Sequence, residues 1–221
     1  MPASTPVFTN ILCAVDGTRT STEAVKMATM LAGPGGHLTL LAVTAVVGSG
    51  AFTSAAIAPT RAKRILSTAK QIPEKAGVPS TTVVDPGGPP VDVILERARN
   101  YDLLVMGAPA ISWLGSMIIG GVATVALRQF TTPMLVVRRS SAGSLPGGQI
   151  LVASDGEEGS DHLVELAGRL GQSHDARVTL VNALGAESKM NPRVIQAQAL
   201  ELKHALPTAA SPTSNPARLG T

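Results

Sequence analysis

Short apolar runs alternate with amphipathic segments over residues 8–139, and this alternation limits the fold more than any other feature of the chain. The apolar runs have strand length and are typical of strands buried on both faces; they occur at 10–16, 37–47, 80–85, 102–107 and 133–139. Segments with helical spacing of apolar residues follow at 19–32, 60–77, 89–100 and 116–130. Pro73 falls inside the second of these helices and should end or kink it. Strands that alternate with helices require right-handed crossovers, so the sequence predicts a parallel α/β sheet with helices on both faces.

The opening of this pattern occurs a second time at residues 150–183. The stretch ILCAVDGT is echoed by ILVASDGE, which aligns Asp16 with Asp155 and Gly17 with Gly156. A second strand containing Thr-Leu follows in both stretches, after one extra residue in the later copy. This agreement favours duplication over chance.

The second copy stops early, because only one further helical stretch and then a Pro/Ser/Thr-rich end follow its second strand. Nothing in it corresponds to the glycine loop and the last two strands of the first copy. The sequence therefore predicts a complete domain at 8–139, a linker at 140–148, an incomplete second repeat at 149–206 and a disordered tail at 207–221.

The composition excludes several classes of protein. Hydrophobic residues make up 44% of the chain, enough to fill a core, and only 2% of residues are aromatic, so that core must be aliphatic. The net charge of +3 comes from dispersed lysines and arginines with no basic run beside aromatics, which argues against nucleic-acid binding. No apolar stretch reaches the roughly 18 residues of a membrane span, so no membrane insertion is expected.

The reactive residue types give no catalytic or metal-binding pattern. Cys13 is the single cysteine and lies in an apolar run, where it is expected to be a core residue rather than a nucleophile. The four histidines are scattered without partners at ligand spacing, so no metal site is predicted. The first ten residues lack the basic start and apolar core of a signal peptide. Together with the lack of any possible disulfide, this predicts a cytoplasmic protein.

The candidate site residues are those at the carboxyl ends of the strands, where ligands of open parallel sheets bind. Asp16 and Gly17 follow the first strand, Val43 closes the second, and Gly107 follows the fourth. Glycines before a helix are typical of loops that cradle phosphate, but the residues after Gly107 are equally compatible with tight packing of a strand against a helix.

Three motifs, ILCAVDGT, DLLVMG and TTPMLVVRR, together resemble the universal stress protein (UspA-like) family. The resemblance covers residues 8–139 as a full domain and 149 to about 206 as the front of a second. It implies a five-stranded parallel sheet of the Rossmann-like, adenine nucleotide alpha hydrolase-like class, and a regulatory role in stress response. Many members are homodimers, and a subset binds ATP, which makes an adenine nucleotide the candidate ligand.

The resemblance also implies a phosphate-binding loop with the spacing glycine, two residues, glycine, nine residues, glycine, then serine or threonine. Gly107 and Gly120 match that pattern, whereas Ala110 and Gly121 replace the second glycine and the hydroxyl residue. A Cβ at Ala110 hinders close approach of phosphate, and Gly121 removes one hydrogen bond. Residual nucleotide binding should therefore be weak or absent.

Two candidate residues have more than one interpretation. In the ATP-binding members the residue at Asp16 lies near adenine and ribose, but an aspartate here could equally cap the following helix. Val43 could offer its backbone to the adenine edge, while its side chain is expected in the core.

The sequence leaves two functions open. The first is a regulatory module that binds ATP or another adenine nucleotide without turnover, because no Walker lysine, general base or metal-binding carboxylate pair accompanies the loop. The alternative is a dimeric scaffold of the same fold that binds a protein partner and no nucleotide. An adenylating enzyme is disfavoured, since no Ser-Gly-Gly sequence follows the first strand.

Overall fold

The protein divides into two compact units, Met1–Ala142 and Gly143–Thr221, called the first and the second unit below. The computed structural model describes residues 6–44, 57–107, 132–137, 148–154, 160–182 and 196–200. The boundary between the units falls inside the segment predicted as a linker. The helix predicted at 116–130 and the tail predicted at 207–221 lie outside the described residues.

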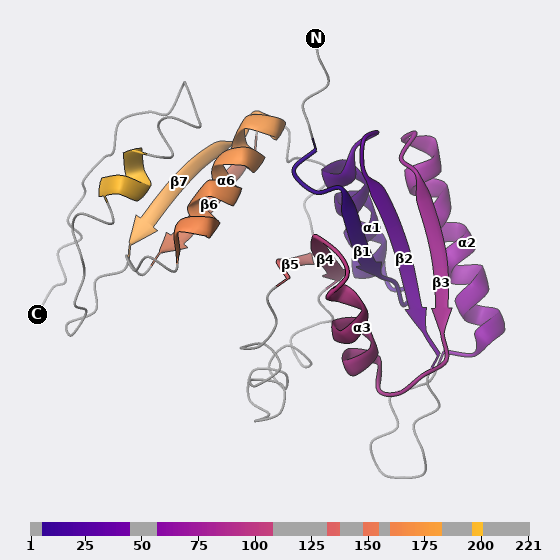
Figure 1. Ribbon diagram of the computed structural model, residues 1–221. Coiled ribbons are helices and arrows are strands. Elements are labelled where there is room, and N and C mark those ends of the chain that lie inside the picture. Colours follow the sequence, from indigo (N-terminus) through magenta and orange to yellow (C-terminus); the bar gives the residue numbers. More distant parts are fainter. Residues whose placement is uncertain are drawn as a thin grey trace, which may run out of the picture. The chain divides into compact units, whose positions relative to one another are not determined.

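The first unit contains a five-stranded parallel sheet in the order β3-β2-β1-β4-β5 (Figure 1). Its strands are β1 (Asn10–Ala14), β2 (His37–Val43), β3 (Ser80–Asp85), β4 (Leu103–Gly107) and β5 (Met134–Val137). The predicted five-stranded parallel α/β fold is thus confirmed. The strand predicted at 37–47 ends at Val43.

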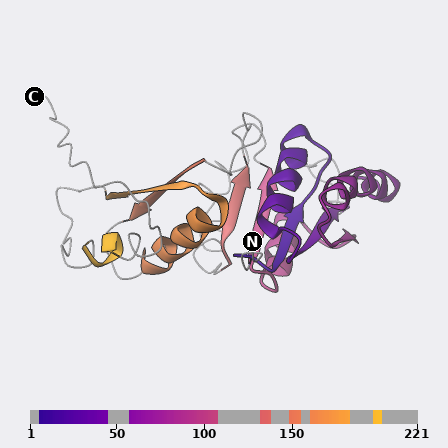
Figure 2. The ribbon, with the colours of Figure 1, turned by 90° about the horizontal axis from the view of Figure 1, so that it is seen from above.

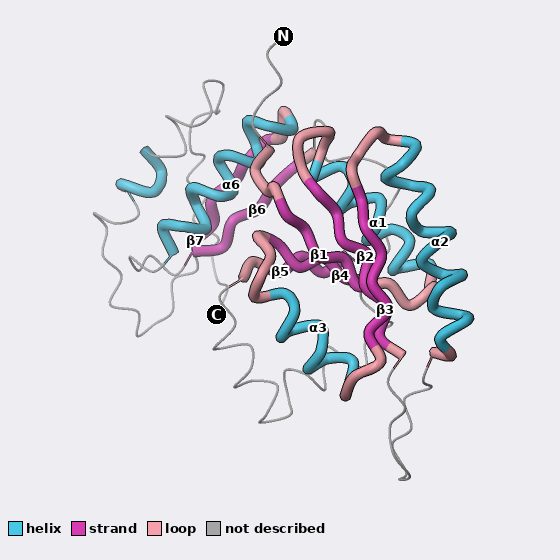
Figure 3. The backbone as a smooth tube through the Cα atoms, turned by 45° about the vertical axis from the view of Figure 1, so that its right-hand side comes forward, coloured by secondary structure: helices cyan, strands magenta, loops and turns pink. Residues whose placement is uncertain are grey.

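Helices cover both faces of this sheet, with α1 (Arg19–Ala32) and α2 (Pro59–Lys75) on one face and α3 (Pro90–Ala98) on the other (Figure 3). On the α3 face, Leu12 of β1 and Leu41 of β2 are almost completely buried beneath Leu95 and Ala98. Aliphatic residues therefore build the core, as the composition predicts. Within the described residues, no helix is long and apolar enough to cross a membrane.

Pro73 does not end α2, because the helix continues for two more residues, to Lys75. Proline has no N–H to donate to the preceding turn, so it is tolerated only where few hydrogen bonds depend on it. Here the helix ends two residues later, and the N–H of Ala76 donates to the carbonyls of Ile72 and Pro73. The buried Pro73 ring thus lies in the last turn, close to the predicted break.

A carboxylate joins the starts of β1 and β4, which are far apart in the sequence. Asp102 Oδ2 accepts hydrogen bonds from the Thr9 N–H at 2.8 Å, the Thr9 hydroxyl at 2.7 Å and the Asn10 N–H at 2.9 Å. Burial raises the pKa of Asp102, but these hydrogen bonds outweigh it and hold the pKa below its usual value. The carboxylate therefore stabilises the sheet at neutral pH, and this stabilisation is lost as the pH falls through the lowered pKa.

Cys13 is fully buried in the middle of β1. Burial in apolar surroundings raises the pKa of its thiol, because the thiolate cannot be solvated there. Cys13 is therefore a core residue, in agreement with the sequence.

The second unit contains a parallel pair of strands, β6 (Gln149–Ser154) and β7 (Arg177–Asn182), with α6 (Asp161–His174) along one side (Figure 2). On that side Val152 packs with Val164 and Ala167. Strand residues alternate between faces, and the opposite face carries Leu151 and Val181, which are 68% and 42% exposed. Among the described residues, one face of this ribbon is therefore covered by α6, and the other carries exposed apolar side chains.

Residues 196–200 are helical and are held to the second unit by a buried amide. Gln198, only 1% exposed, accepts a hydrogen bond from the Ser154 hydroxyl at 2.9 Å and donates to the Asp161 carboxylate at 2.7 Å. These bonds join the end of β6 to the start of α6.

Candidate functional site

The strand order of the first unit reverses between β1 and β4. The chain passes from β1 to β2 on one side and returns to β4 on the other, so the order reverses between β1 and β4. Ligands of open parallel sheets bind at such a reversal. Ala14 pairs with Met106, which brings Asp16 and Gly17 to the same edge of the sheet as Gly107.

Asp16 organises the turn between β1 and α1. Its Oδ1 accepts hydrogen bonds from the Thr18 N–H at 2.8 Å and the Thr18 hydroxyl at 2.7 Å. Thr18 in turn caps α1 by accepting from the Ser21 N–H at 3.2 Å. The interpretation of Asp16 as the helix cap is therefore wrong. Thr18 is the cap, and Asp16 holds Thr18 in place.

The Asp16 carboxylate is exposed beside two hydroxyls. Both of its hydrogen bonds are on Oδ1, and no described residue donates to Oδ2. The hydroxyls of Thr18 and Thr20 lie 3.1 Å apart next to it. The carboxylate can accept hydrogen bonds from the hydroxyls of a ribose or the amino group of an adenine, and threonine hydroxyls can both donate and accept.

Gly17 is favoured by its backbone conformation and lies against a neighbouring helix. Its φ is +83°, a conformation that strains any residue with a Cβ. A Cβ at this position would also lie 2.8 Å from Cδ1 of Ile65, in the second turn of α2. The turn after β1 is therefore in direct contact with α2.

Gly107 is required by close packing of β4 against α1. A Cβ there would lie 2.5 Å from the carbonyl carbon of Thr20 and 2.6 Å from the nitrogen of Ser21, both backbone atoms of the first helical turn. Tight strand–helix packing thus explains this glycine, whichever ligand binds above it. Gly107 lies at the carboxyl end of β4, as predicted.

Val43 contributes to the core with its side chain and to the edge of the sheet with its backbone. The side chain belongs to the same cluster as Leu12 and Leu41. Backbone groups alternate along a strand: Thr44 N–H donates to Asp85 on β3, while Leu41 C=O accepts from Val15 after β1. The N–H and C=O of Val43 therefore point toward the β1 side, where Asp16 follows.

The sequence missed Asp85, a buried carboxylate at the end of β3. Its Oδ1 accepts from the Gly87 N–H at 2.9 Å, and its Oδ2 pairs with Arg97 of α3 at 2.5 Å. The Gly87 hydrogen bond, aided by Arg97 and opposed by burial, lowers the pKa of Asp85. An aspartate at a strand end, with an arginine on the following helix, was the available signal. Asp85 therefore joins the end of β3 to α3, and it lies away from the reversal of strand order between β1 and β4.

The other predicted loop residues, Ala110, Gly120 and Gly121, lie outside the described residues. The structure thus brings together Asp16, Gly17 and Gly107 and orients the Val43 backbone toward them. In the described ranges no group of histidine, cysteine and acidic side chains could hold a metal ion.

Comparison with known proteins gives one family. A family model described as the universal stress protein family matches residues 8–138. No curated protein matches the chain. The structure of a universal stress protein from Archaeoglobus fulgidus DSM 4304 is 19% identical, with a TM-score of 0.67, over 86% of this chain and 71% of that chain.

Two further solved structures are similar to part of the chain. A universal stress protein in complex with cAMP is 24% identical over 61% of this chain and 99% of its own, with a TM-score of 0.45. The Archaeoglobus fulgidus universal stress protein in complex with dAMP is 22% identical over 59% of this chain and 98% of its own, with a TM-score of 0.42.

Proposed function

Since the chain belongs to the universal stress protein family, we propose that its first unit is a regulatory module that binds an adenine nucleotide weakly and without turnover. The observation that carries this proposal is the exposed Asp16 carboxylate at the reversal of strand order, beside Gly107. A carboxylate in this position can accept hydrogen bonds from ribose hydroxyls, and the nearby Val43 backbone can meet the edge of a base.

Weak binding follows from the loop after β4. Ala110 and Gly121 stand where the ATP-binding members have a glycine and a hydroxyl residue. The loop also has no lysine that could neutralise phosphate charge. We propose binding without hydrolysis because the same loop offers no general base.

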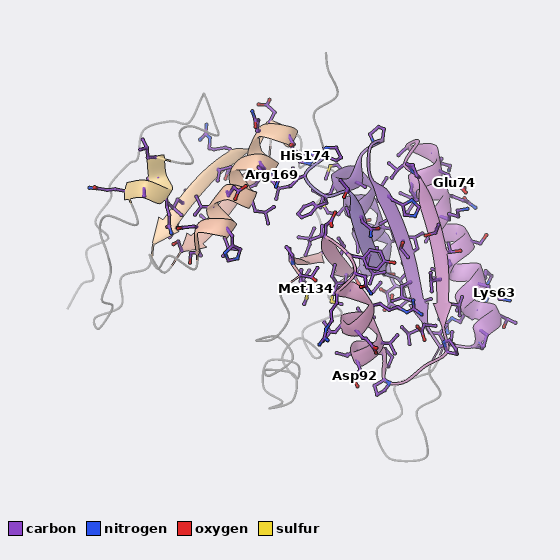
Figure 4. All side chains as sticks on the ribbon, in the orientation of Figure 1. Lys63, Glu74, Asp92, Met134, Arg169 and His174 are labelled. Atoms are coloured by element: carbon purple, nitrogen blue, oxygen red, sulfur yellow. The ribbon has the colours of Figure 1, made fainter. Side chains whose placement is uncertain are left out.

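Calorimetry with ATP tests this function. We expect the natural sequence to bind ATP with a dissociation constant above roughly 1 μM. The Asp16→Ala variant should bind ATP at least about tenfold more weakly, because hydrogen bonds to a charged group contribute about 1.5–3 kcal/mol. Asp92→Ala removes an exposed acid of α3 as a control and should change nothing (Figure 4). The double variant Ala110→Gly with Gly121→Ser should bind more tightly. Sub-micromolar binding by the natural sequence, or equal binding by the Asp16→Ala variant, would contradict the proposal.

We also propose that the second unit is an incomplete repeat of the first. Support comes from the strand register: Ile11 pairs with Leu38 in the first unit, and the aligned Ile150 pairs with Val178 in the second. Each pair of strands is parallel and is joined by a helix of 14 residues.

The alternative function, a dimeric scaffold that binds no nucleotide, is favoured by the open face of β6 and β7. A two-stranded sheet is marginal alone, and exposed apolar faces mark contact surfaces. We propose that the chain forms a homodimer, and that the second unit supplies the contact through Leu151 and Val181.

Deleting residues 148–221 separates the two proposals. The first unit has its own five-stranded sheet, so the truncated chain should keep its circular dichroism and its nucleotide affinity. Light scattering should show fewer chains per particle than for the full chain at equal concentration. An unfolded truncated chain, or an unchanged number of chains per particle, would contradict these expectations.

A further inference from the structure

The hydroxyls beside Asp16 form a chain of hydrogen bonds that has one direction. A carboxylate can only accept, so the Thr18 hydroxyl is the donor in its 2.7 Å contact with Asp16 Oδ1. This bond uses the single proton of that hydroxyl. In the 3.1 Å contact between the hydroxyls of Thr20 and Thr18, the donor is therefore Thr20. The chain runs from Thr20 through Thr18 to Asp16.

This direction decides what the turn can offer to a ligand. The Thr18 hydroxyl also accepts from the Ser21 N–H at 3.2 Å, which fills its remaining capacity. Thr20 has used its proton, so its oxygen can only accept from a ligand. The same holds for Asp16 Oδ2, to which no described residue donates. Of these side chains, a ligand therefore meets two acceptors and no donor.

Thr20 lies on the β4 side of Asp16. A Cβ at Gly107, the last residue of β4, would lie 2.5 Å from the carbonyl carbon of Thr20, so the two backbones are in close contact. Asp16 follows β1, which stands between β2 and β4 in the sheet. Val43, the last residue of β2, is on the far side of β1. From β2 to β4, the carboxyl edge thus presents the Val43 backbone, the Asp16 carboxylate and the half-buried Thr20 in that order.

We propose that Asp16 and Thr20 recognise the two hydroxyls of a ribose, so that the ligand is a ribonucleotide rather than a deoxyribonucleotide. This inference rests on the proposed nucleotide function and deepens it, because it adds Thr20 and assigns each hydroxyl an acceptor. A base at Val43 places C1′ of the sugar toward β2, and a phosphate at the loop after β4 places C5′ toward that loop. The 2′ hydroxyl, next to C1′, then donates to Asp16 Oδ2, and the 3′ hydroxyl donates to Thr20 Oγ1.

Two acceptors without a donor make this part of the site selective. A ribose diol has two protons to give, and each finds a partner. When one hydroxyl is missing, one acceptor loses its water without gaining a hydrogen bond, which weakens binding. A phosphate group in the same place would set oxygen against oxygen beside a carboxylate and would be repelled. The same pair of acceptors therefore keeps the phosphates on the side of the loop after β4.

Calorimetry on the full chain with ATP, 2′-deoxy-ATP and 3′-deoxy-ATP tests the inference. ATP should bind at least about fivefold more tightly than either analogue, which is the effect of one hydrogen bond. Thr20→Val removes the acceptor and nearly keeps the shape of the side chain. It should abolish the preference for ATP over 3′-deoxy-ATP and keep the preference for ATP over 2′-deoxy-ATP. Thr20→Ser keeps the hydroxyl and should restore the first preference.

Thr22→Val is the matched control, because it removes a hydroxyl from the same turn of α1. Thr22 lies two residues after Thr20, so its side chain points to a different flank, and its hydroxyl donates to the Thr18 carbonyl at 3.1 Å. This variant should keep both preferences. Equal binding of ATP and 3′-deoxy-ATP by the natural sequence, or an unchanged preference in Thr20→Val, would overturn the inference while leaving the nucleotide function intact. Absence of ATP binding would overturn the nucleotide function and the inference with it.

Discussion

Replacing Gly107 by alanine should lower the free energy of unfolding of the first unit by about 3 kcal/mol, at the upper end of the range for overpacked sites. The added methyl group would lie 2.5–2.7 Å from three backbone atoms of Thr20 and Ser21. A flexible side chain could move away, but a helical turn cannot move without breaking the Thr18 cap. Denaturant unfolding followed by circular dichroism measures the loss.

Gly35→Ala is the matched control for this experiment. An added Cβ at Gly35 would lie 3.3 Å from the Pro6 side chain and would meet no backbone. Its effect should stay within about 0.5 kcal/mol, as for most surface substitutions. Equal stabilities of Gly107→Ala and the natural sequence would contradict the role of Gly107 in packing β4 against α1.

Leu12→Ala should destabilise the protein by about 2–5 kcal/mol, whereas Leu151→Ala should change stability by no more than about 0.5 kcal/mol. The two leucines occupy aligned positions in β1 and β6. Leu12 is completely buried beneath Leu95 of α3, so its removal leaves a cavity. Leu151 is 68% exposed, and its truncation removes little buried contact.

Hydrogen exchange of peptides from β1 and β6 measures the two effects separately, since the units need not unfold together. Measurements at several protein concentrations serve as the control. If Leu151→Ala strongly lowered the hydrogen-exchange protection of the β6 peptides at low protein concentration, this would contradict the exposure of Leu151 in the single chain.

The sheet of the first unit could be predicted because its strands are encoded locally. The apolar run at 80–85 coincides with β3, and the run at 102–107 includes all of β4. The buried strands of a parallel sheet need continuous apolar residues, and such runs stand out from the polar helices and turns. Gly107 was predicted at its place because a glycine after an apolar run marks the end of a strand.

The interactions across the sheet could not be predicted in the same way. The sequence shows Asp16 beside a helix but not that Thr18 takes the cap. It shows a basic segment at 61–64 but not the contact of Ile65 with Gly17. Each depends on a distance between groups that only the folded chain defines.

The Asp102 link between β1 and β4 also has a consequence for the order of assembly during synthesis. Its two ends lie 93 residues apart, so at about 5–20 residues per second the ribosome needs on the order of 5–20 s to make the second end. β1 is the middle strand, yet β2 and β3 become available to it long before β4. The nascent chain can therefore build the half β3-β2-β1 first, with the β4 side of β1 open. Until residue 107 emerges, β1 has an unpaired edge, which is the point at which a chaperone or another nascent chain can reach it.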